Sequence, residues 1–249
     1  TEEIRLLLLA CSNARQRAIV HLFTATGCRP EGMADLKMKD IDFMEDGFTG
    51  IIFYSGDKHE FQHFCHFEAT AAINDYLDTR KQKGEELTPE TYLFSKVNCI
   101  GDEQGRMLGV GIGSVIEHLM KTSGIERVKQ NKKRYDVPVC NGFRNRFNTL
   151  FEKIYNIPYA IKEKFMDHNY RLENSYFFPT KLELLDEYKK AVPELLVSKE
   201  SRLKLENENK QKQIEELESD KDIQINKMQL QIDSMLEMFS SVKELRKRN

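Results

Sequence analysis

The apolar residues of this 249-residue chain recur at two different spacings. In some stretches they return every three or four residues, the pattern of an amphipathic helix with one buried face. These stretches predict helices over residues 1–9, 14–26, 68–83, 141–154 and 159–167, and the start of another over 115–121. The helix predicted over residues 14–26 is followed by Gly27, a residue type that commonly ends a helix.

Strand patterns lie between these helices. Residues 48–54 and 61–67 have the composition and alternation typical of strands, and the turn residues 55–58 between them predict a β-hairpin. Lys58 lies near its tip, where a lysine ordinarily keeps a sheet edge soluble. Residues 92–94 predict a short buried segment. The predicted fold is therefore mainly α-helical with a small antiparallel β-hairpin.

Two segments have compositions that suggest a nucleotide site and a metal site, but the spacing of their residues supports neither. Residues 98–113 hold five glycines, which we take as too many for a regular element, and they lack the terminal lysine and serine of a P-loop. The hairpin carries His59, His63, Cys65 and His66. Side chains alternate faces along a strand, so His66 cannot join His63 and Cys65 around one ion. We therefore predict neither a nucleotide site nor a metal site.

The composition changes at Lys199. From there to the end the chain has eleven basic and eleven acidic residues and no proline or glycine. Its last half repeats apolar residues at spacings of three and four, namely Ile225, Met228, Ile232, Met235, Phe239 and Val242. This pattern predicts a coiled coil through residues 199–249; a single exposed helix, or one folded back on the body, is the alternative. We accordingly predict two domains, residues 1–197 and 198–249.

Charge and cysteine content indicate the kind of partner and the cellular compartment of the protein. The formal net charge is −2, but residues 127–146 contain seven Lys or Arg and a single acidic residue, Asp136. Such a run indicates either a polyanion-binding patch or a solvated loop. The five cysteines form no close pairs and no signal peptide precedes them, which favours a reducing, intracellular compartment. The apolar run at residues 6–10 is too short to cross a membrane.

Three residues near the middle of the chain indicate phosphoryl transfer. Arg144 lies at the start of its predicted helix, His168 follows the next helix, and Tyr176 comes eight residues later. Arginine can bind a phosphate bidentately, histidine can donate a proton or hydrogen bond, and the hydroxyl of tyrosine can attack phosphorus.

In these residues the chain resembles the tyrosine recombinases, or phage-type integrases. That family has an H-x-x-R motif, a G-H or near equivalent, and a nucleophilic tyrosine eight or nine residues later. A second block, Thr26–Asp42, matches the first family box with Arg29, Leu36 and Asp40-Ile41-Asp42 in register. The resemblance covers residues 1–197, and the Tyr-Phe-Phe-Pro context of Tyr176 is similar to the archaeal branch. It implies the mainly helical catalytic-domain fold, here without the family's N-terminal core-binding domain.

The resemblance also implies a role for each residue. Arg29 and Arg144 would bind the scissile phosphate with His168, Tyr176 would attack, and Lys58 would protonate the leaving 5′ oxygen. The product would be a 3′-phosphotyrosyl link, formed without metal, ATP or other cofactor. Asn141 stands where the family most often has histidine; it can hydrogen-bond a phosphate but cannot carry a proton.

The partners follow from the same resemblance. We expect double-stranded DNA to contact the basic residues Arg127, Lys129, Lys132, Lys133, Arg134 and Arg146. We also expect a synaptic tetramer on DNA, no membrane, and a cytoplasmic, nucleoid-associated protein of an archaeal host or of a viral or mobile element.

Two alternatives remain open at this point. The first is a type IB topoisomerase with the same chemistry. The second, which Asn141 keeps open, is a catalytically silent DNA-binding protein dimerised by its coiled coil. If the class is right but the nucleophile wrong, Tyr170 is the next candidate.

Overall fold

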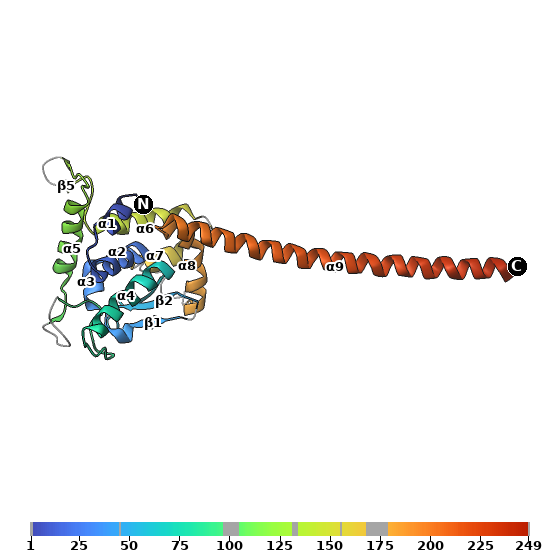
Figure 1. Ribbon diagram of the computed structural model, residues 1–249, viewed down its shortest axis with the longest axis horizontal. Helices are drawn as coiled ribbons and strands as arrows, with labels where there is room; N and C mark the ends of the chain where they lie inside the picture. Colours follow the sequence, from blue (N-terminus) through green and yellow to red (C-terminus); the bar gives the residue numbers. More distant parts are fainter. Residues whose placement is uncertain are drawn as a thin grey trace. The chain divides into compact units, whose positions relative to one another are not determined.

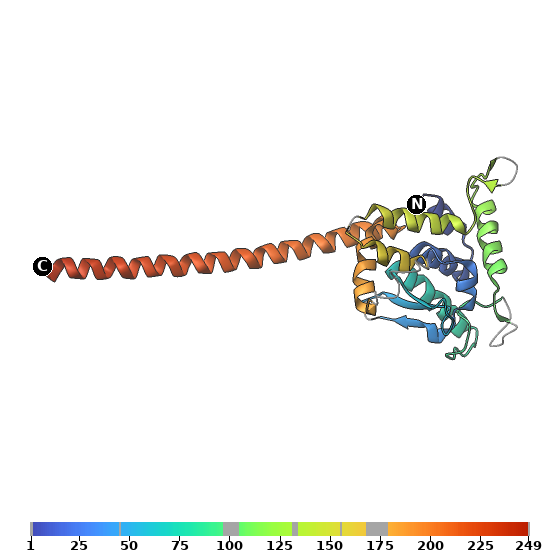
Figure 2. The ribbon, with the colours of Figure 1, turned by 180° about the vertical axis from the view of Figure 1, so that it is seen from behind.

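The computed structural model describes residues 2–44, 46–96, 105–130, 134–154, 156–167 and 179–248, of which residues 130, 134, 236, 237 and 239–248 are described by their backbone alone. The chain forms two compact units, Thr1–Lys199 and Glu200–Asn249 (Figures 1 and 2). The elements in chain order are α1 (Glu2–Ala10), α2 (Ala14–Thr26), α3 (Pro30–Asp35), η1 (Met38–Asp40), β1 (Ile41–Phe43), β2 (Thr49–Phe53), β3 (Phe61–Cys65), α4 (Phe67–Gln82), α5 (Gly109–Thr122), β4 (Lys129–Gln130), β5 (Arg134–Tyr135), α6 (Asn141–Lys153), α7 (Tyr159–Phe165), α8 (Lys181–Leu195) and α9 (Lys199–Arg248).

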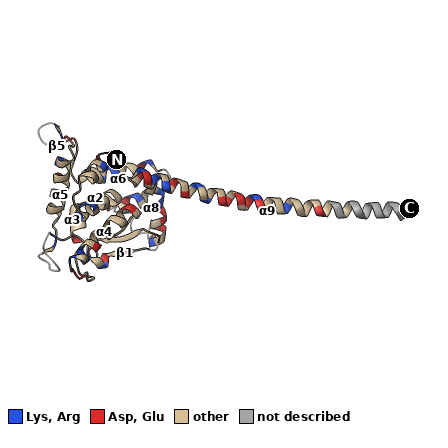
Figure 3. Ribbon diagram, in the orientation of Figure 1, with Lys and Arg blue, Asp and Glu red and all other residues tan. Residues whose placement is uncertain are grey.

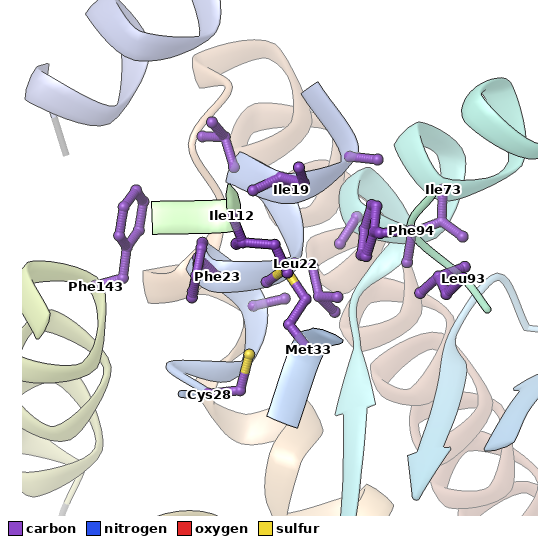
Figure 4. Close-up of a cluster of buried hydrophobic side chains, with 14 of the residues drawn as sticks. Ile19, Leu22, Phe23, Cys28, Met33, Ile73, Leu93, Phe94, Ile112 and Phe143 are labelled. Carbon is purple, nitrogen blue, oxygen red and sulfur yellow. The ribbon is translucent and has the colours of Figure 1, made fainter. Parts of the chain in front are cut away.

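Helix α2 is the centre of the first unit. Its N-terminus is capped by Asn13, whose side chain accepts a hydrogen bond from the backbone N–H of Gln16 at 3.0 Å. From Ala18 to Thr26 nearly every side chain is buried, because α1, α4, α5 and α6 all pack against this helix. Figure 4 shows Ile19, Leu22 and Phe23 of α2 among side chains from these neighbours, including Phe143 of α6.

The predicted hairpin is confirmed and extended by one strand. The three strands form an antiparallel sheet in the order β1-β2-β3, with Ile51 opposite both Ile41 and His63. His63 is buried among aromatic rings, 5.0 Å from the ring of Phe165 and 5.8 Å from that of Tyr188, and burial lowers its pKa to about 3. The structure therefore gives this histidine a neutral packing role in the core.

The prediction that residues 98–113 form no regular element was wrong for its last part. Helix α5 begins at Gly109 and includes Gly111 and Gly113. The missing side chain of Gly109 is what permits close packing, since a Cβ there would lie 3.1 Å from the backbone nitrogen of Glu31 in α3. Glycine weakens an isolated helix but lets two helices approach closely. Here the close packing of α5 against α3 outweighs the cost of glycine within the helix.

The second unit is the greater part of α9. Apolar side chains of the predicted seam are exposed along it, among them Ile225, Met228, Ile232 and Met235. Basic and acidic residues intersperse along its described part (Figure 3). No helix among the described residues is long and apolar enough to cross a membrane. The mainly helical fold with a small antiparallel sheet and a long C-terminal helix is thus confirmed; its pairing as a coiled coil stays a prediction.

Candidate active site

The site begins at the C-terminus of α2, where Gly27 turns the chain. Gly27 has φ +58° and donates its N–H to the carbonyl of Phe23 at 2.8 Å. A Cβ at this position would lie 2.8 Å from the Cβ of Phe147 and 3.3 Å from the Cα of Arg144. Both the positive φ and the close contact require glycine, so this residue seats the end of α2 directly against α6.

Two residues later the chain presents Arg29. Its backbone is extended and precedes α3, and its side chain remains 45% exposed. One terminal nitrogen, Nη1, donates to Oδ2 of Asp167 at 2.6 Å. The Asp167 side chain is only 15% exposed, so it contacts the guanidinium from the protein side and leaves part of the planar fork open to solvent.

Arg144 reaches the same place from the second turn of α6. Its Nη1 donates to the carbonyl of Gly27 at 3.1 Å, and its Nη2 donates to the carbonyl of Met166. Burial lowers the pKa of Arg144, the positive charge of Arg29 lowers it further, and the carboxylate of Asp167 opposes both. The two guanidinium groups are therefore close enough to repel each other, as expected of a site that receives an anion.

Two residues around Arg29 were missed by the sequence analysis. Asp167 is next to the predicted His168, and that adjacency was its only signal. Tyr54 follows β2 with no motif to mark it, yet its hydroxyl interacts with Arg29 and would lie 3.0 Å from a Cβ at Gly32. Burial raises the pKa of Tyr54, and the charge of Arg29 opposes this shift.

The neighbouring thiol is chemically quiet. Cys28 is fully buried between Gly27 and Arg29, and burial raises its pKa to about 12. A neutral, enclosed thiol neither competes for an anion nor acts as a nucleophile.

Lys58 and Asn141 lie exposed on elements that flank the arginines. Lys58 is in the turn of the β2–β3 hairpin, which is closed by a hydrogen bond from the N–H of Asp57 to the carbonyl of Tyr54 at 2.9 Å. Asn141 is the first residue of α6, one turn before Arg144. Residues three apart on a helix share a face, so both side chains can serve one ligand.

Several predicted site residues lie outside the described residues. These are His168, Tyr170, Tyr176, Lys132 and Lys133. Within the part of the chain that is described, no three His, Cys, Asp or Glu side chains gather as metal ligands would.

The basic segment forms a two-stranded hairpin of β4 and β5, with Lys129 opposite Tyr135. Arg127 lies over the ring of Tyr135 at 4.1 Å and donates to the carbonyl of Val137 at 2.8 Å. Lys129 is exposed, and its Nζ lies 5.5 Å from the centroid of the same ring. Arg146 donates to the carbonyl of Glu194 at 3.0 Å, at the C-terminus of α8. Arg127 and Arg146 thus have intramolecular roles, and Arg134 is described by its backbone alone.

Comparison with known proteins places this geometry in a family. Residues 1–168 match the sequence profile described as "Phage integrase family". The chain belongs to the phage integrase family. This membership confirms the resemblance to tyrosine recombinases, while the archaeal branch stays a prediction.

Solved structures of a recombinase and of a phage integrase share the fold. The XerA recombinase is 22% identical with a TM-score of 0.51, over 76% of this chain and 62% of its own. The integrase from mycobacterium phage Brujita is 14% identical with a TM-score of 0.52, over 76% of this chain and 55% of its own. The present chain therefore spans less than two thirds of either protein. No curated protein sequence matches it significantly.

Proposed function

We propose that this chain cleaves and rejoins DNA strands through a covalent tyrosine intermediate, as a site-specific recombinase or integrase. The observation that carries the proposal is the convergence of Arg29 and Arg144, distant in sequence, on the C-terminus of α2. Two adjacent guanidinium groups with one fork partly open are suited to the non-bridging oxygens of a phosphodiester.

In the proposed reaction, Tyr176 attacks the phosphorus while the arginines and His168 bind the non-bridging oxygens. The bond from phosphorus to the 5′ oxygen breaks, Lys58 gives that oxygen a proton, and a 3′-phosphotyrosyl link remains, while the hydroxyl proton of Tyr176 is released to solvent. The covalent link conserves the energy of the broken bond, so strand exchange needs no ATP, and the charge balance is supplied by side chains rather than by a metal. Asn141 adds a hydrogen bond to the phosphate.

The proposed DNA-facing surface consists of the β4–β5 hairpin and the start of α6. Of its six predicted residues, we expect exposed Lys129 to contribute mainly to salt-dependent affinity, and Arg127 and Arg146 to contribute less because each already donates to a backbone carbonyl. A synaptic tetramer, a nucleoid setting and an archaeal or viral host belong to the same proposal.

The direct test is covalent trapping. The protein is incubated with a nicked suicide duplex carrying a candidate attachment site and resolved on a denaturing gel. We expect an adduct that is absent in Tyr176→Phe and is formed ~10²–10³-fold more slowly in Arg29→Ala and Arg144→Ala, as when a preorganised oxyanion donor is lost.

Each other outcome selects an alternative. DNA binding without an adduct would favour the silent DNA-binding protein. An adduct that persists in Tyr176→Phe would support the same reaction class but assign the nucleophile to another residue. Tyr170→Phe would then be the next variant to test. An adduct-forming enzyme that relaxes supercoils but does not recombine paired sites would be a topoisomerase.

We further propose that residues 198–249 are a separate domain that self-associates as a coiled coil. The support is the exposed seam of α9, in which Ile225 and Ile232 are one heptad apart. The control for a seam variant is Leu230→Asp, because Leu230 is also exposed but lies between seam positions.

Sedimentation equilibrium separates the two readings of the tail. We expect Ile232→Asp to weaken self-association at least ~10-fold, about 1.4 kcal/mol, and Leu230→Asp to leave it nearly unchanged. A parent chain that is monomeric at every concentration would reject the coiled coil and leave a single exposed helix or a helix folded back on the body.

A further inference from the structure

In the described part of the chain, the strained backbone positions lie around one side chain, that of Arg29. Among the described residues, the two non-glycine residues with positive φ are Tyr54, at +54°, and Asp167, at +48°. An aspartate tolerates this region, whereas for a bulky tyrosine it is a true outlier. Asp167 accepts a hydrogen bond from Arg29, and the hydroxyl of Tyr54 interacts electrostatically with the same guanidinium, although the two residues are far apart in the sequence.

We infer that Tyr54 and Asp167 are positioning residues that hold Arg29 ready for the scissile phosphate. This inference rests on the proposed function. Strained residues persist where the surrounding structure fixes them, and they cluster at functional sites. Asp167 supplies the ion pair to Nη1 at 2.6 Å, and Tyr54 supplies its hydroxyl beside Gly32, where an added Cβ would lie 3.0 Å from that hydroxyl.

We call the pair of Asp167 and Tyr54 around Arg29 the clamp. It also explains how the like-charged guanidinium groups of Arg29 and Arg144 stay together in the absence of DNA. Arg144 is fixed by two backbone carbonyls, so repulsion would act mainly to displace Arg29, which is nearly half exposed. The carboxylate of Asp167 offsets the repulsion that Arg29 exerts on Arg144. Because Met166 accepts from Arg144 and Asp167 accepts from Arg29, one two-residue corner after α7 orders both guanidinium groups.

Tyr54 adds a connection to the proton donor proposed above. It begins the turn that carries Lys58, and its carbonyl accepts from Asp57 within that turn. The electrostatic interaction of the Tyr54 hydroxyl with Arg29 therefore links the base of the hairpin to the phosphate-binding side chain.

The test uses variants that keep the backbone. Asp167→Asn removes the charge with a residue type that tolerates positive φ, and Tyr54→Phe removes only the hydroxyl. Asp46→Asn breaks an ion pair with Lys189 at 2.8 Å, away from Arg29, and Tyr92→Phe alters a ring that packs under Lys37; these are the matched controls.

We expect Asp167→Asn and Tyr54→Phe to slow adduct formation at saturating DNA by ~10–100-fold, as a misplaced catalytic group does. Neither substitution should weaken the affinity for duplex DNA, measured in a Tyr176→Phe background so that no strand is cleaved. Both control variants should behave as the parent. In an Arg29→Ala background neither substitution should slow the reaction further. Equal rates in test and control variants, or a further loss in the Arg29→Ala background, would overturn the inference.

A second readout does not depend on cleavage. In arginine side-chain ¹⁵N NMR, assigned with Arg29→Lys, the guanidinium of Arg29 should rotate slowly in the parent and freely in Asp167→Asn. Slow rotation of the Arg29 guanidinium in a parent protein that forms no adduct would support the clamp and contradict the proposed reaction. Free rotation in the parent would reject the clamp.

Discussion

Arg29 and Arg144 reach one site from two regions that hold them differently. Arg144 lies on a 13-residue helix whose Phe143, Phe147 and Phe151 are buried in the core, and it donates to backbone carbonyls. Arg29 lies on the short link between α2 and α3, and its described partners are the side chains of Asp167 and Tyr54.

This difference in partners separates the contribution of each arginine to folding stability from its contribution to catalysis. Carbonyls at the ends of α2 and α7 are fixed by the fold, so Arg144 joins these elements as well as facing the site. The guanidinium of Arg29 is nearly half exposed, and an ion pair with one partner so exposed to water contributes little to folding. We therefore expect the two arginines to matter about equally for strand cleavage and very unequally for stability.

The largest expected effect on stability comes from Arg144→Ala. It leaves the carbonyls of Gly27 and Met166 without their donor, which we expect to lower the free energy of unfolding by roughly 2 kcal/mol, after allowing for the repulsion from Arg29 that is relieved. The measurement is urea denaturation followed by near-UV circular dichroism. The chain has nine tyrosines and no tryptophan, and none of the tyrosines lies in α9, so this signal reports the first unit.

Arg17→Ala is the matched control, because Arg17 is exposed on α2 outside the site. Arg144→Lys sharpens the comparison: it keeps the positive charge but cannot reproduce two divergent donors, so it should recover only part of the loss. An Arg144→Ala protein as stable as Arg17→Ala would show that the carbonyl contacts do not support the fold.

The sequence was informative where a pattern is local. Apolar spacing predicted α2, α4 and α6 within a residue or two, and the alternation of residues 48–67 predicted the hairpin. The two arginines could be assigned to one site only through the family boxes that contain them. In each case the signal lies within a short stretch of chain.

The rest depended on tertiary contacts. The N-terminal part of helix α5 was missed because the glycines that would weaken this helix in isolation also let it approach α3. Tyr54 and Asp167 are far apart in sequence, and neither carries a motif; only the fold brings both to Arg29. The roles proposed for Tyr176, His168, Lys58 and Asn141 stay predictions of the resemblance.

The smallest expected effect on stability comes from Arg29→Ala. Removing the guanidinium breaks a partly exposed ion pair but also removes a charge that repels Arg144, so the free energy of unfolding should change by less than about 1 kcal/mol. The same denaturation experiment, with Arg17→Ala beside it, measures the change, while adduct formation should fall as far as in Arg144→Ala. A loss of stability equal to that of Arg144→Ala would erase the distinction between the two regions and make Arg29 part of the folding core. A near-neutral change together with lost cleavage would instead place the function of Arg29 in the chemistry, which is where a half-exposed guanidinium held by strained neighbours has its use.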